Sequence, residues 1–256
     1  MHQLSSYLKF LWQSKNQHGV HSPFVYKLVT ECFYDQTPYE DYKALDAYRK
    51  ALKHSKTVLK VMDLGAGSKR LKTSKRRVAS MVNIAGSSRT KAYLLYRICN
   101  HMHCTNGLEL GTSLGIGSYA LALGHRDGQL TSIEGCTNTS HFAKTQLTER
   151  GITNIHFLVG NFTDVIPSLP ATNYDLVFFD GHHQKQATLN YFESLLPKAH
   201  NDSVFIFDDI YWSKGMTEAW ETIKTHPKVK VTVDTFHLGL VFFRSEQAKE
   251  HFKIRL

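Results

Sequence analysis

The chain has 256 residues, 42% of them hydrophobic and 30 aromatic (15 Phe, 12 Tyr and 3 Trp), which suffices for one large or two small folded domains. This composition excludes a disordered chain. No apolar run approaches the roughly 20 residues that span a bilayer, and the first residues lack a signal-peptide core with a cleavage site. The four cysteines show no paired spacing, which argues against a disulfide framework. We therefore expect a soluble, cytoplasmic protein without a membrane partner.

The positive charge is concentrated in the first part of the chain. Residues 1–105 hold 18 Lys and Arg against 6 Asp and Glu, a net charge of +12, whereas residues 106–256 hold 13 against 16. Six cations lie within the nine residues of Lys69–Arg77 (KRLKTSKRR). Such a surface attracts acidic partners, so an anionic small molecule and a nucleic acid are both candidate partners. No recognised RNA-binding module is present.

Residues 1–105 predict a helical extension. Its apolar residues recur at helical spacing, with Lys and Arg on the opposite face. Capping and stop residues mark four candidate helices, which begin after Ser22-Pro23, cover residues 39–54, run from Ser74 to Gly86 and begin after Ser87 or Ser88.

From Asn106 the pattern changes to strand, turn and helix. Short apolar strands that alternate with helices are typical of a parallel sheet covered on both faces. The expected strands cover residues 107–110, 129–133, 155–159, 174–179, 203–207, 229–235 and 238–244. The expected helices cover residues 116–123, 140–150, 165–169, 185–196 and 214–225. The sequence thus predicts an α/β fold for residues 106–256, a Rossmann-like sheet of seven mostly parallel strands with an antiparallel last strand.

Two glycine-rich segments are candidates for binding a ligand. Residues 63–67 (DLGAG) lead into the basic run without an acidic strand end nearby, and we interpret them as a tight turn. Residues 109–117 (ELGTSLGIG) follow a strand, and Glu134 ends the next strand, 23 residues after Gly111. That arrangement is typical of a nucleotide-like ligand whose ribose is bound by the acid. The acid before the first glycine suits an ammonium group, which favours S-adenosylmethionine over NAD.

Five segments, in this order, carry a resemblance to a known family: LELGTSLGIGSYALALG, LTSIEG, LVGNF, YDLVFFDGHH and SVFIFDDIYWSKGM. They resemble the class I S-adenosylmethionine-dependent methyltransferases, closest to the O-methyltransferases of the catechol and caffeoyl-CoA type. The resemblance covers about residues 87–244. It implies S-adenosylmethionine as cofactor and a cofactor site made of Glu109, Gly111, Ser113, Gly115 and Ser118 for the methionine part, Glu134 for the ribose, Asn161 and Phe162 for the adenine, and Asp180 toward the substrate. Asn161 stands where the family has an acidic residue.

Methyl transfer to a hydroxyl needs a means of removing the hydroxyl proton, either a base or a divalent cation. The resemblance implies Asp180 as a residue between cofactor and substrate, and we expect it to be catalytic. His182 and His183 stand where relatives usually carry an acid and a lysine, and His183 or its neighbour His182 is a candidate base. Asp180, Asp208 and Asp209 follow two neighbouring strands, and such an oxygen-rich cluster suits Mg²⁺ or another divalent cation. Relatives carry Asp-Asn where this chain has Asp208-Asp209, so both routes stay open.

The methyl acceptor is also left open. The favoured reading is a small hydroxylated molecule, selected by the basic extension of residues 1–105. The alternative is an RNA-binding protein or RNA methyltransferase that uses the same basic extension. A homodimer is compatible with either.

Overall fold

The computed structural model describes residues 2–62, 74–84 and 86–256. The turn at residues 63–67 and the first part of the basic run Lys69–Arg77 lie outside these described residues. The chain divides into two compact units, residues 36–168 and residues 1–35 with 169–256. This division differs from the predicted boundary at residue 105, because the helices of residues 1–105 are shared between the two units. A substrate-selecting role for residues 1–105 stays a prediction.

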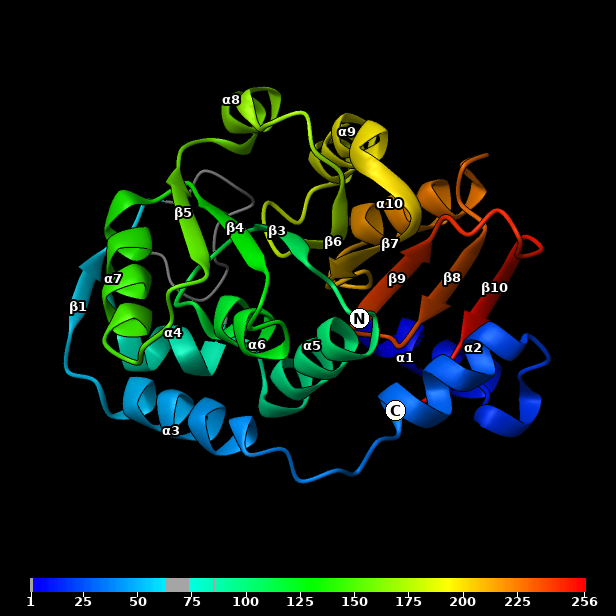
Figure 1. The fold of residues 1–256 in the computed structure, drawn as a ribbon, viewed down its shortest axis with the longest axis horizontal. Helices are drawn as coiled ribbons and strands as arrows, with labels where there is room; N and C mark the ends of the chain where they lie inside the picture. The colour runs from blue at the N-terminus through cyan, green and yellow to red at the C-terminus, as the bar shows by residue number, and fades with distance from the viewer. Residues whose placement is uncertain (1, 63–73, 85) are drawn as a thin grey trace. The chain divides into compact units, whose positions relative to one another are not determined.

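The unit of residues 36–168 is built on three parallel strands (Figure 1). They are β3 (Asn106–Leu110), β4 (Gln129–Glu134) and β5 (Ile155–Val159). The helices are α3 (Asp41–His54), α4 (Val78–Ile84), α5 (Arg89–His101), α6 (Ile116–Gly124), α7 (Thr137–Thr148) and α8 (Phe162–Val165), with a 3-10 turn at Ile166–Ser168. Parallel neighbours need crossover connections, and α6 and α7 provide them between β3, β4 and β5.

Local sequence signals explain where these helices begin. The Ser88 hydroxyl accepts the Lys91 N–H at 3.1 Å, so Ser88 caps α5 as predicted. Helix α3 buries Leu45, Tyr48 and Leu52, which belong to the stripe predicted over residues 39–54. Helix α6 consists of small and apolar residues and is buried along its whole length.

A short hairpin in this unit is not predicted by the sequence. Strand β1 (Val58–Lys60) pairs antiparallel with β2 (Lys75–Arg77). The helix expected from Ser74 therefore begins only at Val78. Strands of three residues rich in Lys and Arg show too little apolar alternation to be recognised.

The unit of residues 1–35 and 169–256 contains five strands. They are β6 (Tyr174–Phe179), β7 (Ala199–Asp208), β8 (Val231–Asp234), β9 (Leu238–Phe242) and β10 (Glu250–Lys253). Strands β6 and β7 are parallel, β9 is antiparallel to β7 and β8, and β10 is parallel to β8. Helices α9 (Lys185–Leu195) and α10 (Lys214–Thr225) pack together, and a 3-10 turn at Leu196–Lys198 follows α9.

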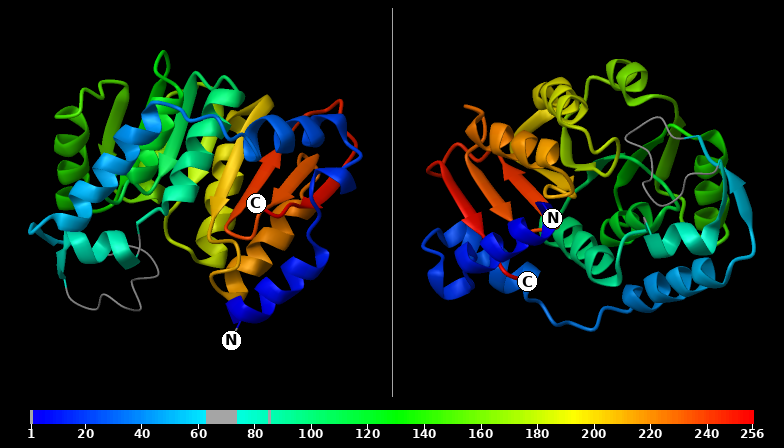
Figure 2. Two further views of the ribbon diagram at one scale, coloured as in Figure 1. Left: turned by 90° about the horizontal axis from the view of Figure 1, so that it is seen from below. Right: turned by 180° about the vertical axis from the view of Figure 1, so that it is seen from behind.

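The N-terminal helices of this unit are α1 (His2–Gln13) and α2 (Pro23–Leu28), drawn in blue in Figures 1 and 2. A 3-10 turn at Gln17–Gly19 separates them, and a π-helical turn at Val29–Phe33 follows α2. Ser22 caps α2 and Pro23 takes its first position, as the sequence predicts. Lys15 forms a bridge beside Ile254, which ties the segment after α1 to the segment after β10.

The predicted α/β class is confirmed, with mostly parallel strands and N-terminal helices. All seven expected strands are present as β3–β9, and the antiparallel β9 is confirmed. Strand β10 is an addition to the prediction, because Glu-His-Phe-Lys holds a single apolar residue. Within the described ranges, none of the helices has the length and apolar character needed to cross a membrane. The cytoplasmic location stays a prediction.

Candidate functional site

The glycine-rich turn after β3 adopts backbone conformations that favour glycine. Gly111 and Gly115 have φ angles of 109° and 74°, and Ser113 between them has 48°. A Cβ on Gly115 would also lie 3.1 Å from Cδ1 of Leu147 in α7. Position 115 therefore requires glycine both for its left-handed conformation and for close packing.

Glu134 ends β4 and holds this turn in place. Its Oε2 accepts the N–H of Ser113 at 2.8 Å, and its Oε1 accepts the N–H of Cys136 at 2.9 Å. The two segments meet because β3 and β4 pair in register up to Leu110 and Ile133. Each carboxylate oxygen has a second lone pair, so this half-buried group can accept further hydrogen bonds from a ligand.

Glu109 is buried within β3 and joins three elements. Its Oε2 accepts the hydroxyls of Ser118 from α6 and Ser132 from β4, the second at 2.5 Å. Ser132 lies directly opposite Glu109 in the β3–β4 register. In the part of the chain that the structure describes, the other oxygen, Oε1, has no hydrogen-bond partner. Burial raises the pKa of Glu109 to about 7, although the two serine hydroxyls act in the opposite direction.

Tyr48 is a contributor to the site that the sequence does not reveal. Its hydroxyl donates to the carbonyl of Leu114, inside the glycine turn, at 2.6 Å. The guanidinium carbon of Arg150 lies 4.7 Å from the centroid of its ring. In the sequence, Tyr48 is only one member of the apolar stripe of α3. Tyr48 is fully buried, and a buried tyrosine hydroxyl usually has a hydrogen-bond partner. Its burial therefore indicates a contact with another segment.

Asn161 and Phe162 lie just beyond β5. The Asn161 Oδ1 accepts the N–H of Thr163 at 3.4 Å and so caps α8, while the Phe162 side chain is buried. Strands β3, β4 and β5 are parallel, so these residues share the carboxyl edge of the sheet with Gly111 and Glu134. Ligands of open α/β sheets bind along that edge.

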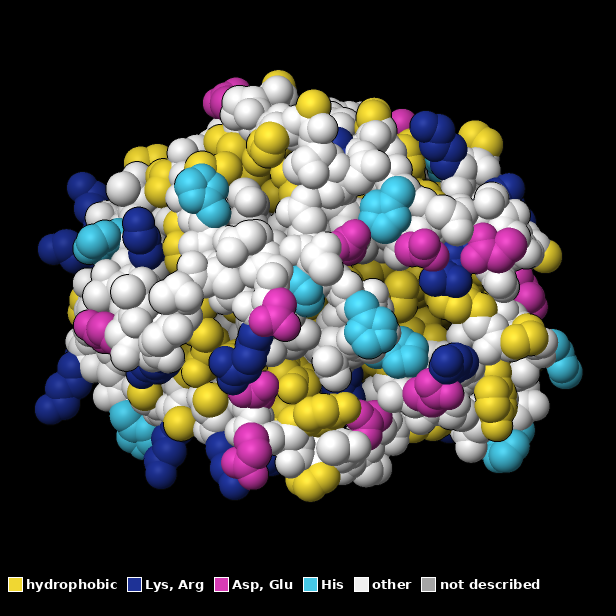
Figure 3. All heavy atoms as spheres, viewed as in Figure 1, with side chains coloured by type: hydrophobic (Ala, Val, Ile, Leu, Met, Phe, Trp, Pro, Cys, Tyr) yellow, Lys and Arg dark blue, Asp and Glu magenta, His cyan; other side chains and the backbone are white. Residues whose placement is uncertain are grey.

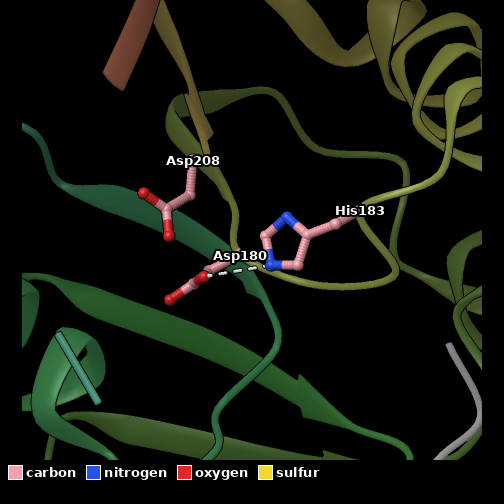
Figure 4. A group of neighbouring side chains, drawn as sticks. All are labelled: Asp180, His183 and Asp208. Atoms are coloured by element: carbon pink, nitrogen blue, oxygen red, sulfur yellow. Dashed lines mark ion pairs between the residues drawn. The ribbon is translucent and has the colours of Figure 1, made fainter. Parts of the chain in front are cut away.

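The second unit gathers chemically reactive side chains at the ends of β6 and β7 (Figure 4). Phe179 and Phe207 pair in register and their rings stack at 4.3 Å, so the residues that follow them, Asp180 and Asp208, end side by side. Nε2 of His183 lies 3.7 Å from Oδ1 of Asp180. Side-chain ligand atoms of Asp180, His183 and Asp208 all lie within 4.8 Å of one another. Two carboxylates and an imidazole fit a divalent cation.

This group differs from the predicted ligand set, since it contains His183 and not Asp209. Strand β7 ends at Asp208, so its pairing with β6 does not position Asp209. Asp209 also has a φ of 53°, and its N–H donates to the His237 carbonyl at 2.9 Å. The three aspartates of the prediction are therefore not the residues that the structure brings together.

The loop after β6 explains how His183 reaches Asp180. His182 and His183 both have positive φ angles, 66° and 30°, which turn the chain back toward the strand end. His182 is directed elsewhere, with its Nδ1 2.9 Å from the hydroxyl of Tyr191 in α9. Of the two candidate bases, His183 is thus the one beside Asp180.

The basic excess of residues 1–105 lies partly on α3, on β1 and on the segment between them. Lys43, Lys50, Lys53, Lys56 and Lys60 are all exposed there. Figure 3 shows Lys and Arg side chains along this edge of the unit, spread among other side chains. Lys43 is paired with Glu40 at 2.9 Å. This pattern is typical of a solvated face, and nucleic-acid binding stays a prediction.

One family model matches part of the chain. Residues 108–210, from β3 to just after β7, match the family model described as a methyltransferase domain. This part of the chain is therefore similar to a methyltransferase domain. No curated protein sequence matches the chain significantly.

Several solved structures share the fold of this chain. The O-methyltransferase TomG from Streptomyces achromogenes, in complex with S-adenosylmethionine, is 21% identical over 63% of this chain and 83% of its own, with a TM-score of 0.56. A Staphylococcus aureus protein provisionally named a caffeoyl-CoA O-methyltransferase is 19% identical over 61% and 84%, with a TM-score of 0.55. The Podospora anserina methyltransferase PaMTH1, bound to S-adenosylhomocysteine, is 12% identical over 88% and 97%, with a TM-score of 0.62. The predicted resemblance to class I S-adenosylmethionine-dependent methyltransferases is confirmed for domain and fold.

Proposed function

We propose that the protein transfers the methyl group of S-adenosylmethionine to a hydroxyl oxygen of a small molecule. The observation that carries this proposal is the contact between Glu134 and the glycine turn, which sets an acidic strand end against a left-handed turn. A ligand with a ribose and an extended polar tail fits that arrangement. TomG and PaMTH1, which share the fold, were solved with S-adenosylmethionine and S-adenosylhomocysteine.

The residues present fit this cofactor. Glu134 would accept the ribose hydroxyls, and the turn from Gly111 to Gly115 would receive the methionine part. Oε1 of Glu109 has no partner among the described residues, and the ammonium group of the cofactor would supply one. Ser118 serves this site indirectly, because its hydroxyl holds the Glu109 carboxylate. Asn161 would offer the adenine a neutral acceptor beside the ring of Phe162.

A thermal-shift titration with S-adenosylmethionine tests the cofactor assignment. We expect the cofactor to stabilise the protein, with an affinity at least tenfold lower in Glu134→Ala and a smaller loss in Glu134→Gln. Glu149→Gln, an exposed change at the end of α7, is the matched control and should leave the affinity unchanged. Equal stabilisation of wild type and Glu134→Ala, or no stabilisation at all, contradicts the proposal.

The chemistry of transfer assigns a second role to the group at the ends of β6 and β7. Bound S-adenosylmethionine supplies a methyl group on a sulfonium sulfur, and the acceptor oxygen must lie in line with that bond. The oxygen gains the methyl group, the sulfur keeps the bonding electrons, and the hydroxyl proton passes to water. We place the acceptor hydroxyl at Asp180, His183 and Asp208, which would hold a divalent cation, and that cation would lower the pKa of the hydroxyl. The imidazole favours Mn²⁺, Fe²⁺ or Zn²⁺ over Mg²⁺ in this site.

Titration of the cofactor-free protein with Mn²⁺, followed by electron paramagnetic resonance, tests this assignment. We expect His183→Ala and Asp180→Asn to weaken Mn²⁺ binding at least tenfold. Asp209→Asn, which alters the adjacent carboxylate outside the group, should leave it unchanged. Loss of binding in Asp209→Asn but not in His183→Ala would restore the ligand set implied by the resemblance. Methyl transfer that resists EDTA but is lost in His183→Ala would assign His183 as the base instead.

The small hydroxylated acceptor is supported by the fold that the chain shares with named O-methyltransferases. Mass spectrometry of metabolites and RNA from cells with and without the protein distinguishes it from the RNA alternative. A small molecule that lacks one methyl group in the deleted cells supports the proposal. An RNA nucleoside that lacks it contradicts the proposal.

A further inference from the structure

Helix α1 presents an apolar surface that the rest of its unit does not cover. Leu4, Leu8 and Trp12 are 66%, 61% and 85% exposed. Residues four positions apart lie on one side of a helix, so the three form a continuous stripe. The inner side of α1 is held by Phe10, whose buried ring packs on Phe236 with centroids 5.6 Å apart. The apolar face of α1 is thus wider than the surface on which it packs.

The helix is fixed at both ends, so this exposure is not the result of a detached terminus. At its start, Nε2 of His2 lies 2.9 Å from the hydroxyl of Thr217 in α10. At its end, Arg255 donates to the Leu11 carbonyl at 2.8 Å. In the left view of Figure 2, α1 is the dark blue helix beside the label N, and no other described segment of its unit lies on its outer side.

The surroundings of the stripe are cationic. Residues 1–30 contain three lysines and no Asp or Glu. Lys9, Lys15 and Arg255 are exposed at or beside α1, and Lys253 donates to the Gln13 side chain at 2.8 Å.

The acidic groups Asp234 and Glu221 act electrostatically on Lys253, but each also has another partner. Asp234 is buried and accepts the Tyr211 hydroxyl at 2.5 Å. Glu221 is paired with Lys224 at 2.6 Å. The stripe therefore combines exposed Leu and Trp side chains with a positive flank.

We propose that α1 docks in the plane of an anionic lipid membrane, with Leu4, Leu8 and Trp12 in the interfacial layer and Lys9 and the cations beside it at the headgroups. Leucines on one side, lysines at the flank and an indole at the boundary are the composition of an interfacial helix. A second copy of the chain would bring like charges together, and a convex helix offers no groove for a peptide.

This inference changes the expectation that the protein has no membrane partner. That expectation rests on the length needed to span a bilayer, whereas a helix lying in the interface needs only one apolar side. The sequence shows leucines and a tryptophan at helical spacing, but it does not show which of them the fold leaves uncovered.

Co-sedimentation of the full chain with lipid vesicles tests the proposal. We expect binding to vesicles of equal parts phosphatidylcholine and phosphatidylglycerol, and at least tenfold weaker binding to phosphatidylcholine alone. Leu8→Glu should reduce the binding at least tenfold, and Lys9→Glu should reduce it and its sensitivity to salt. Tyr26→Glu on α2, where the tyrosine is 47% exposed, is the matched control and should bind like wild type.

Trp12 provides a direct readout, because the indole fluorescence should shift to the blue with anionic vesicles and not in Trp12→Ser. Leu4→Ser replaces Leu8→Glu if circular dichroism shows that the latter is unfolded. Absence of binding to anionic vesicles, or equal binding by the stripe variants and wild type, overturns the proposal. A dimer detected by light scattering that dissociates in Leu8→Glu also overturns the proposal, because the stripe would then be an interface between two copies of the chain. None of these readouts depends on methyl transfer.

Discussion

The buried carboxylate of Glu109 makes a quantitative prediction about stability and pH. Its pKa in the folded chain is raised by burial from 4.5 to about 7. The folded protein therefore holds this proton more tightly than the unfolded chain does. The stabilisation from the protonated group is fully present below about pH 4.5 and is lost as the pH rises toward about 7.

The size of the effect follows from the shift in pKa. A difference of about 2.5 units, at about 1.4 kcal/mol per unit, corresponds to about 3 kcal/mol of unfolding free energy lost between pH 4.5 and pH 7. In Glu109→Gln the group does not titrate, so this part of the pH dependence should disappear. The glutamine amide will lack an acceptor where Oε1 now lies, but that cost does not vary with pH.

Urea unfolding of wild type and Glu109→Gln at several pH values between 5 and 8 measures this difference directly. We expect the wild type to lose about 2–3 kcal/mol more than the variant across this range. Groups that do not interact with Glu109 titrate equally in both proteins and cancel in the comparison. Parallel loss of stability in wild type and variant would refute the reasoning, because the carboxylate would then ionise at the same pH in both folded and unfolded chains.

Binding of the proposed cofactor should depend on the same ionisation of Glu109. An ammonium group beside Glu109 favours the ionised carboxylate, so S-adenosylmethionine should bind wild type more tightly as the pH rises from 5 to 7.5. The gain should reach ten- to a hundredfold and be absent in Glu109→Gln. Binding that does not vary with pH in wild type would place the ammonium group elsewhere.

Three further substitutions have calculable effects. Tyr211→Phe removes the hydroxyl donor to buried Asp234 and should cost about 1–3 kcal/mol in urea unfolding, whereas a neutral result would mean that water replaces the hydroxyl. Gly115→Ala places a side chain at a φ of 74° and should cost about 1–2 kcal/mol while weakening cofactor binding in calorimetry. Tyr48→Phe leaves the buried Leu114 carbonyl without its donor and should lower cofactor affinity up to about tenfold; a change confined to the KM of the acceptor would contradict this.

The regular elements of the fold are those that the sequence predicts best. Strands β5 and β6 and helix α10 coincide with the predicted ranges residue for residue. Each is a clear apolar pattern bounded by Gly, Pro, Asn or Ser, so local preference and burial agree. The hairpin β1–β2 and strand β10 were not predictable in this way. They have three or four residues, many of them charged, and tertiary pairing alone makes them strands.

The residues proposed for the cofactor site could be selected from the sequence, but their contacts could not. The glycine turn and the acidic strand end predict where Gly111 and Glu134 lie. That Ser132 faces Glu109 depends on the register of β3 and β4, which the residues do not specify. The place of His183 beside Asp180 depends on positive φ angles at two consecutive histidines. Histidine adopts that conformation too rarely for a sequence pattern to predict it.

The structure also changes the meaning of the basic first third of the chain. Its charge suggested a separate element that selects substrates. Its best-defined contact with the candidate site, however, is an uncharged hydrogen bond to the glycine turn. Tyr48 of α3 holds the carbonyl of Leu114 between Ser113, which Glu134 anchors, and Gly115. Because a buried hydrogen bond fixes position far better than an exposed lysine does, α3 fixes the geometry of the glycine turn through its buried face. The lysines on its outer face are then free to vary in sequence without disturbing the turn.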